Sequence, residues 1–223
     1  MAKDPVKEHY VQVPSDEVLL DADLAVPQNA EGLVAFAHGS GSNRHSPRNR
    51  FVAESMHRAG LGTLLVSQLT VEEEAEDIIT AKLRFDIALL GRRLTGVVDW
   101  LNTNSETSRL KIGIFGASTG AAGALLAAAQ RPELVGAVVS RGGRPDLAMR
   151  VLDRVKAPTL LIVGGDDFPV IEMNRTAFAA LRAPKEMVTV PGATHLFEEP
   201  GTLEKVAALA TNWFVKYLKP PVK

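Results

Sequence analysis

The sequence contains no cysteine, and this absence removes several kinds of chemistry. Disulfides, thiolate metal sites and a cysteine nucleophile are all excluded. The chain also lacks an excess of either charge, with a formal net charge of −1 over 223 residues. Because surfaces that bind nucleic acid or anionic membranes are strongly basic, we expect neither nucleic acid nor a membrane as a partner.

Long apolar runs are also missing. The longest weakly polar stretch, 120–129, is too short and too rich in alanine to span a bilayer. The first residues, MAKDPVKEHYVQV, lack the apolar segment of a signal peptide, so we expect a cytoplasmic protein. The 46% hydrophobic residues are typical of a globular chain with a core. No repeat, low-complexity tract or linker interrupts the chain, which predicts a single domain over 1–223.

Strand and helix patterns alternate along the chain. The segment 9–28 alternates polar and apolar residues around Pro14-Ser15-Asp16, which predicts an antiparallel hairpin. Continuous apolar runs predict buried strands, and amphipathic segments between them predict helices. Such alternation predicts an α/β fold: a mostly parallel twisted sheet of about eight strands with an antiparallel N-terminal hairpin and helices on both faces. We expect further strands at 32–38, 62–68, 110–115, 134–140, 158–165 and 186–192, and helices at 46–60, 73–103 (broken near Gly91), 118–131, 171–182 and 201–218.

Three polar residues follow different predicted strands and together suit nucleophilic catalysis. Ligands of such sheets bind at the carboxyl ends of the strands, where Ser118, either Asp166 or Asp167, and His195 are expected. Histidine can take the serine proton, and a carboxylate orients the imidazole and stabilises its charged form. Ser118 lies between Gly116 and Gly120, the pattern of a tight strand-to-helix turn that exposes a nucleophile. The order Ser, Asp, His is the order that α/β-hydrolases use.

These segments resemble the α/β-hydrolase superfamily and, within it, the dienelactone hydrolase-like group. The resemblance covers essentially the whole chain and is carried by AHGSG, GIFGASTGA, TLLIVGGDD and GATHLF. Dienelactone hydrolases proper use a cysteine nucleophile, whereas this chain has Ser118. The acyl-transfer mechanism stays the same, but their particular substrate does not carry over.

The resemblance also implies the remaining parts of the site. The family spacing Gly-x-x-Asp-x-x-Val selects Asp167 as the triad acid, with Asp166 as the alternative, and both could instead cap the following helix. The oxyanion hole is expected from the backbone N–H groups of Thr119 and of Ser40. His38 is expected to be structural rather than catalytic.

Several cationic side chains are expected near this edge. The residues His38-Gly39-Ser40-Gly41, which are expected to supply the Ser40 donor, are called the oxyanion loop below. Asn43 and Arg44 follow this loop, and Arg141 follows another strand. Arginine binds carboxylate and phosphate groups bidentately, so these residues could bind an anionic substrate group. The alternative is solvated arginines, or ion pairs with the acidic run 71–77. That run could begin a helix or form a small flap over the site.

The sequence therefore predicts a carboxylic ester hydrolase with a Ser-His-Asp triad. Its expected substrate is a small ester, thioester or lactone, with or without a carboxylate or phosphate group. Metal-ligand spacing and nucleotide-binding motifs are missing from the sequence, so no metal or organic cofactor is expected. An acyltransferase, an amidase, or a non-catalytic binding protein on the same fold are the alternatives. The sequence does not distinguish a monomer from a homodimer.

Overall fold

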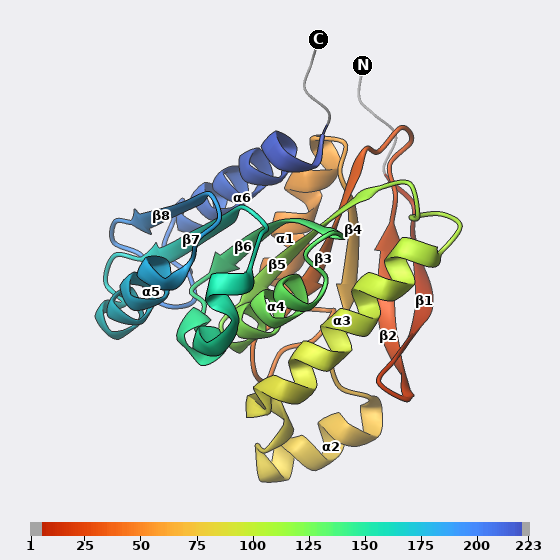
Figure 1. Cartoon of the computed structure of the whole chain (residues 1–223), viewed down its shortest axis with the longest axis horizontal. Coiled ribbons are helices and arrows are strands. Elements are labelled where there is room, and N and C mark those ends of the chain that lie inside the picture. Colours follow the sequence, from red (N-terminus) through yellow and green to blue (C-terminus); the bar gives the residue numbers. More distant parts are fainter. Residues whose placement is uncertain (1–5, 220–223) are drawn as a thin grey trace.

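The structure is a computed structural model that describes residues 6–219. Its centre is one eight-stranded sheet with the strand order β1-β2-β4-β3-β5-β6-β7-β8 (Figure 1). β1 pairs antiparallel with β2, β2 pairs antiparallel with β4, and the other neighbouring strands are parallel. The predicted fold class is therefore confirmed. The strands are β1 (Glu8–Ser15), β2 (Val18–Ala25), β3 (Gly32–Ala37), β4 (Gly62–Val66), β5 (Lys111–Ala117), β6 (Val135–Arg141), β7 (Thr159–Gly164) and β8 (Lys185–Val190).

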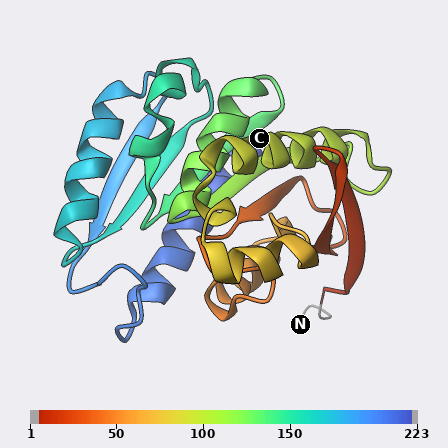
Figure 2. The same cartoon turned by 90° about the horizontal axis from the view of Figure 1, so that it is seen from below.

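Helices cover both faces of this sheet (Figures 1 and 2). One face packs against α3, α4, the 3-10 segment η2 and α5, and the other face packs against α1 and α6. Successive side chains of a strand enter opposite cores: Val34 and Phe36 face α1 and α6, whereas Leu33 and Ala35 face α3 and α4. The helical segments are α1 (Pro47–Arg58), α3 (Ile87–Thr103), α4 (Thr119–Gln130), η2 (Pro145–Arg154), α5 (Phe168–Ala180) and α6 (Thr202–Leu218).

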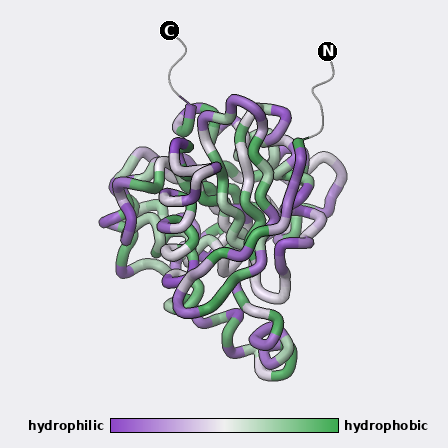
Figure 3. Tube along the Cα trace, turned by 90° about the vertical axis from the view of Figure 1, so that its right-hand side faces the viewer, coloured by the Kyte–Doolittle hydropathy of each residue, from purple (hydrophilic) through white to green (hydrophobic). Residues whose placement is uncertain are grey.

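A small helical unit lies outside these layers. It consists of α2 (Val71–Thr80) and the 3-10 turn η1 (Leu83–Phe85), and it projects at the bottom of Figures 1 and 3. The acidic run begins this helix, as one of the two interpretations predicted. Thr70 Oγ1 accepts the Glu73 N–H while the Glu73 carboxylate accepts the Thr70 N–H. Arg93 of α3 also binds the Glu73 carboxylate, which fastens α2 to the body.

The predicted break near Gly91 is wrong. Instead, the predicted helix is divided into two. α2 ends at its C-cap residue Ala81, which adopts a left-handed conformation with φ 53°, and α3 begins after its N-cap residue Asp86. Gly91 lies inside α3, where an added Cβ would come within 2.7 Å of Leu126 Cδ1 on α4. This glycine therefore permits close helix packing rather than ending a helix.

Smaller differences from the prediction also have local causes. The hairpin turns at Asp16-Glu17, both with positive φ, one residue later than expected. α5 begins at Phe168 rather than 171, because Pro169 occupies a first-turn position that needs no N–H donor. The 3-10 segment η2 was not predicted. The other strand and helix bounds agree to within a few residues.

This topology brings the carboxyl ends of the parallel strands to one edge of the sheet. β3, β5, β7 and β8 end there at the segments that contain Ser40, Ser118, Asp167 and His195. Within residues 6–219, no helix is long and apolar enough to span a bilayer. The same part of the chain contains no group of three or more His, Asp or Glu side chains arranged to hold a metal ion.

Candidate active site

Ser118 occupies a strained turn between β5 and α4. Its backbone has φ 49° and ψ −123°, a conformation that side-chain-bearing residues rarely adopt. The turn is held on both sides, because the Ser118 N–H donates to the Arg141 carbonyl at 3.2 Å and the Ser118 carbonyl accepts the Arg144 N–H at 3.0 Å. Neighbouring β6 and the loop after it therefore fix the backbone that carries the hydroxyl.

The glycines on either side of Ser118 are required by close backbone contacts. A Cβ on Gly116 would lie 2.5 Å from Ala121 Cα, and a Cβ on Gly120 would overlap the carbonyl of Ala37. Gly39 is equally constrained, since its Cβ would lie 2.9 Å from the Ser118 Cβ. The oxyanion loop thus packs directly against the Ser118 side chain.

His195 and Asp167 form a hydrogen-bonded pair. The Nδ1 of His195 lies 2.7 Å from Oδ2 of Asp167, which leaves Nε2 available for a second partner. Asp167 is the N-cap residue of α5, yet its side chain makes no capping bond, so its carboxylate serves His195 instead. Asp166 is exposed, and its recorded contact is a backbone N–H donated to Ala193. The geometry therefore selects Asp167 over Asp166 as the partner of this imidazole.

The loop that carries His195 is tied to the same edge of the sheet. Thr194 bonds the Glu199 carboxylate through both its N–H (3.1 Å) and its hydroxyl (2.5 Å). The ring of His195 packs on Gly142, where an added Cβ would lie 3.6 Å from Nδ1. Gly142 directly follows Arg141, whose carbonyl accepts the Ser118 N–H. Among the described residues, no hydrogen bond joins Ser118 Oγ to His195, so that bond belongs to the proposed mechanism.

His38 holds the expected oxyanion loop in place. It is buried, and burial lowers the pKa of its imidazole to about 4, so the ring is neutral at pH 7. Its Nε2 accepts the Gln68 N–H at 3.2 Å, which places the ring proton on Nδ1, 3.3 Å from the Gly39 carbonyl. In a trans peptide the C=O and the following N–H point in opposite directions. Fixing the Gly39 carbonyl therefore fixes the direction of the Ser40 N–H.

The predicted substrate-binding residues are placed differently from one another. Asn43 lines a cavity beside the oxyanion loop. Arg44 pairs with Asp21 and Asp23 at 3.5 and 3.4 Å and does not line this cavity. Arg141 is buried, with 6% of its surface exposed, and its Nη2 lies 3.4 Å from Asn49 Oδ1. No carboxylate in residues 6–219 pairs with Arg141, and burial together with Arg48 lowers its pKa to about 10.

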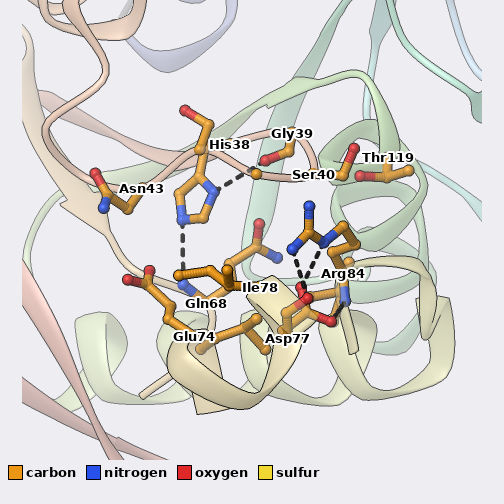
Figure 4. A pocket seen from close by; sticks show the side chains of 14 residues that line it. His38, Gly39, Ser40, Asn43, Gln68, Glu74, Asp77, Ile78, Arg84 and Thr119 are labelled. Carbon is orange, nitrogen blue, oxygen red and sulfur yellow. Dashed lines mark hydrogen bonds and ion pairs between the residues drawn. The ribbon is translucent and has the colours of Figure 1, made fainter. Parts of the chain in front are cut away.

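The cavity has a volume of about 180 Å³ and lies between the oxyanion loop and α2 (Figure 4). Ser40 and Thr119, the expected oxyanion donors, both line it, whereas Ser118 and His195 do not. Sequence reasoning missed most of its other side chains, because they come from segments that gather only in the folded chain. These are Gln68, Leu69, Glu74, Asp77, Ile78, Arg84 and Leu90. The acidic run that was interpreted as a helix or a flap thus also forms one wall of the cavity.

The acidic residues of α2 pair with arginines that were not singled out from the sequence. Arg84 Nε donates to Asp77 Oδ2 at 2.6 Å, and Arg93 binds Glu73. Arg44, by contrast, pairs with two aspartates of β2. Ion pairs with the acidic run 71–77 therefore exist, but Arg84 and Arg93 form them, and Arg44 does not.

The fold, the turn at Ser118 and the His195–Asp167 pair define an α/β-hydrolase. Comparison with known proteins gives the family: residues 51–220 match the model of the dienelactone hydrolase family. The chain belongs to this family. A dienelactone hydrolase from Anabaena variabilis is 58% identical, with a TM-score of 0.95 over 96% of this chain and 99% of that one.

Two further proteins are similar to this chain, one in its fold and one in the sequence of part of its length. Est1E from Butyrivibrio proteoclasticus shares the fold, with a TM-score of 0.78 at 16% identity over 93% of this chain and 98% of that one. A Mycobacterium tuberculosis protein named "Putative phosphoribosyl transferase" is 53% identical over 220 residues, which is 99% of this chain and 49% of that protein. The chain thus spans about half the length of the curated relatives it matches.

Proposed function

We propose that the chain is a serine hydrolase that cleaves a small ester, thioester or lactone through an acyl-Ser118 intermediate. The observation that carries this proposal is the strained turn at Ser118, at the same sheet edge as the His195–Asp167 pair. Membership of the dienelactone hydrolase family supports the same reaction class.

In the acylation step, Ser118, His195, Asp167 and the oxyanion donors each have a defined role. Ser118 Oγ attacks the substrate carbonyl carbon as His195 Nε2 takes the hydroxyl proton. Asp167 accepts the Nδ1–H, which keeps the imidazole in the required tautomer and stabilises its positive charge. The carbonyl oxygen becomes an oxyanion that the N–H groups of Ser40 and Thr119 hold. The bond to the leaving oxygen or sulfur then breaks, and His195 gives its proton to that atom.

Deacylation runs through the same groups in the opposite direction. A water molecule attacks the acyl carbonyl while His195 takes its proton. The second tetrahedral intermediate collapses to the free acid, and His195 returns the proton to Ser118. One water is consumed for each ester bond broken.

The cavity limits the size of the substrate. Its volume of about 180 Å³ is below the roughly 300–1,000 Å³ of sites for drug-sized ligands. α2, a single short helix, contributes Glu74, Asp77 and Ile78 to its wall. The cavity therefore suits a short acyl or alcohol group.

An anionic substrate would depend on Arg141 rather than on Arg44. Arg44 is already neutralised by Asp21 and Asp23, whereas Arg141 is a buried cation with no carboxylate partner among the described residues. A substrate carboxylate or phosphate would supply the missing charge. Arg141→Leu should then lower kcat/KM for an ester monosuccinate more than for the neutral butyrate ester. An equal effect on both substrates would exclude Arg141 as an anion-binding residue.

Hydrolysis of short para-nitrophenyl esters tests the proposal. Ser118→Ala and His195→Ala should lower kcat/KM by several orders of magnitude, because the nucleophile and the base act as one unit. The proposal fails if the folded Ser118→Ala variant retains the activity of the original chain. Circular dichroism of each variant serves as the control for folding.

A further inference from the structure

The cavity beside the oxyanion loop contains polar groups that the fold itself leaves without partners. Gln68 is only 2% exposed, yet within residues 6–219 neither its Oε1 nor its Nε2 makes a hydrogen bond. The buried Thr119 Oγ1 also has no partner in this part of the chain. Both residues line the same cavity, and Figure 4 shows the side chains of Gln68 and Arg84 directed into it. Buried polar groups are normally paired, so these atoms point to a ligand.

The backbone of Gln68 already meets the structural needs of this position. Its N–H donates to His38 Nε2 at 3.2 Å, and its carbonyl accepts Arg93 Nη1 at 2.8 Å. Neither bond involves the carboxamide, so an apolar side chain could serve the fold equally well. The carboxamide is therefore available for a molecule in the cavity.

The charges around the cavity favour an uncharged ligand. Arg84 is neutralised by Asp77, which accepts its Nε–H at 2.6 Å, and Glu74 adds a further carboxylate to the lining. The second guanidinium nitrogen of Arg84, Nη2, donates to the Asp77 carbonyl at 2.6 Å. Nη1 faces the oxyanion loop, 3.5 Å from the position of a Cβ on Gly41. Arg84 thus offers a hydrogen-bond donor without an excess of positive charge.

A hydroxyl group matches this set of partners. It can accept from Gln68 Nε2 or Arg84 Nη1 and donate to Gln68 Oε1. A carboxylate only accepts, so it would leave Oε1 unpaired and would face the carboxylate of Glu74. Because Ser40 and Thr119 line the same cavity, the hydroxyl belongs to the molecule whose carbonyl those two N–H groups bind.

We propose that Gln68 determines substrate specificity, and that with Arg84 and Thr119 it selects an uncharged ester or lactone bearing a hydroxyl group close to the scissile carbonyl. This inference rests on the proposed hydrolase function and names its substrate class. Sites built to bind a hydroxyl discriminate strongly against analogues that lack it, because their own polar groups stay unpaired.

The test compares matched para-nitrophenyl esters: butyrate, its α- and β-hydroxy counterparts, and the monosuccinate. The original chain should give a higher kcat/KM for at least one hydroxy ester than for butyrate, on the order of 10- to 100-fold. Gln68→Leu should abolish most of that ratio. Its melting temperature should be unchanged or higher, because the substitution removes buried atoms that have no partner.

Thr211→Val is the matched control. Thr211 also has a buried hydroxyl for which the described residues supply no partner, but it lies on α6, which packs on the opposite face of the sheet from α3 and α4. This variant should keep the original ratio. The inference is overturned if Gln68→Leu leaves the ratio unchanged, or if the monosuccinate is the best substrate and depends on Gln68.

Failure of this inference can be told apart from failure of the proposed function. If the chain hydrolyses all four esters through Ser118 without preferring a hydroxy ester, the specificity assignment is wrong and the hydrolase stands. If Ser118→Ala retains the original activity, the hydrolase proposal itself is wrong.

Discussion

Buried His38 gives the protein a specific dependence of stability on pH. The folded chain holds this imidazole neutral, because burial lowers its pKa from 6.5 to about 4. In the unfolded chain the same group binds a proton near its ordinary pKa of about 6.5. The stability that His38 supplies is therefore fully present above pH 6.5. It is lost as the pH falls from 6.5 towards 4, where the unfolded state takes up the extra proton.

The size of the loss follows from the two pKa values. Between pH 7 and pH 5, a shift from 6.5 to about 4 removes roughly 2 kcal/mol from the free energy of unfolding. His38→Gln is the matched perturbation, because a glutamine oxygen can accept the Gln68 N–H but does not titrate. The variant should lose about 2 kcal/mol less than the original chain over this pH interval.

Urea denaturation at pH 7 and pH 5 measures this difference. Effects of the other titrating groups are common to both proteins and cancel in the comparison. If both proteins lose the same free energy of unfolding, His38 is not held neutral, and the tautomer that fixes the Gly39 carbonyl would be wrong. The same variant should lower kcat/KM for ester hydrolysis by on the order of 10-fold, since the Ser40 N–H is then less firmly aimed.

Other substitutions test separate parts of the site. Asp167→Asn should lower kcat/KM by on the order of 10³-fold, whereas Asp166→Asn should change it less than about 3-fold; the reverse order would assign the acid to Asp166. Gly39→Ala should cost on the order of 10²-fold in kcat/KM, because the new Cβ lies 2.9 Å from the Ser118 Cβ and must displace one of the two segments. Arg93→Leu should lower the free energy of unfolding by about 3 kcal/mol and speed hydrogen exchange in α2, because the Glu73 carboxylate on that helix loses its buried cationic partner. Unchanged exchange would show that α2 is anchored by other contacts.

The alternation of strands and helices was predictable because it depends on local patterns. A buried parallel strand needs a continuous apolar run, and the segments at β3, β5 and β7 contain such runs. The position of Ser118 was also predictable, since a serine between two glycines at the end of a strand is the pattern of a tight strand-to-helix turn. His195 and Asp167 could be placed at one edge before their contact was seen, because each follows a parallel strand and the carboxyl ends of such strands meet there.

The break in 71–103 shows where local patterns fail. Gly91 suggested an interruption, but its missing side chain serves contact with Leu126 on another helix. The true break uses Ala81 in a left-handed conformation and Asp86 as a cap, and neither residue type is a strong helix breaker. Contact with another helix therefore explains Gly91, whereas the true break is held by local bonds from the Asp77 carboxylate to the N–H groups of Leu83 and Arg84.

The substrate-facing residues were the least predictable part of the site. Arg44 was a reasonable candidate until the fold placed Asp21 and Asp23 of β2 beside it. Gln68 and Arg84 belong to no sequence motif. They became candidates only because both line the cavity and the Gln68 carboxamide has no hydrogen-bond partner among the described residues. Such a property exists only once distant segments meet.

The central claim is that Ser118 is an activated nucleophile, and covalent labelling tests it most directly. A fluorophosphonate probe reacts with a serine that a neighbouring base activates, and mass spectrometry then locates the adduct. We expect one adduct, on the peptide containing Ser118, with no labelling of Ser118→Ala and strongly reduced labelling of His195→Ala. Absence of an adduct on the folded original chain, or an adduct on a different serine, would contradict it.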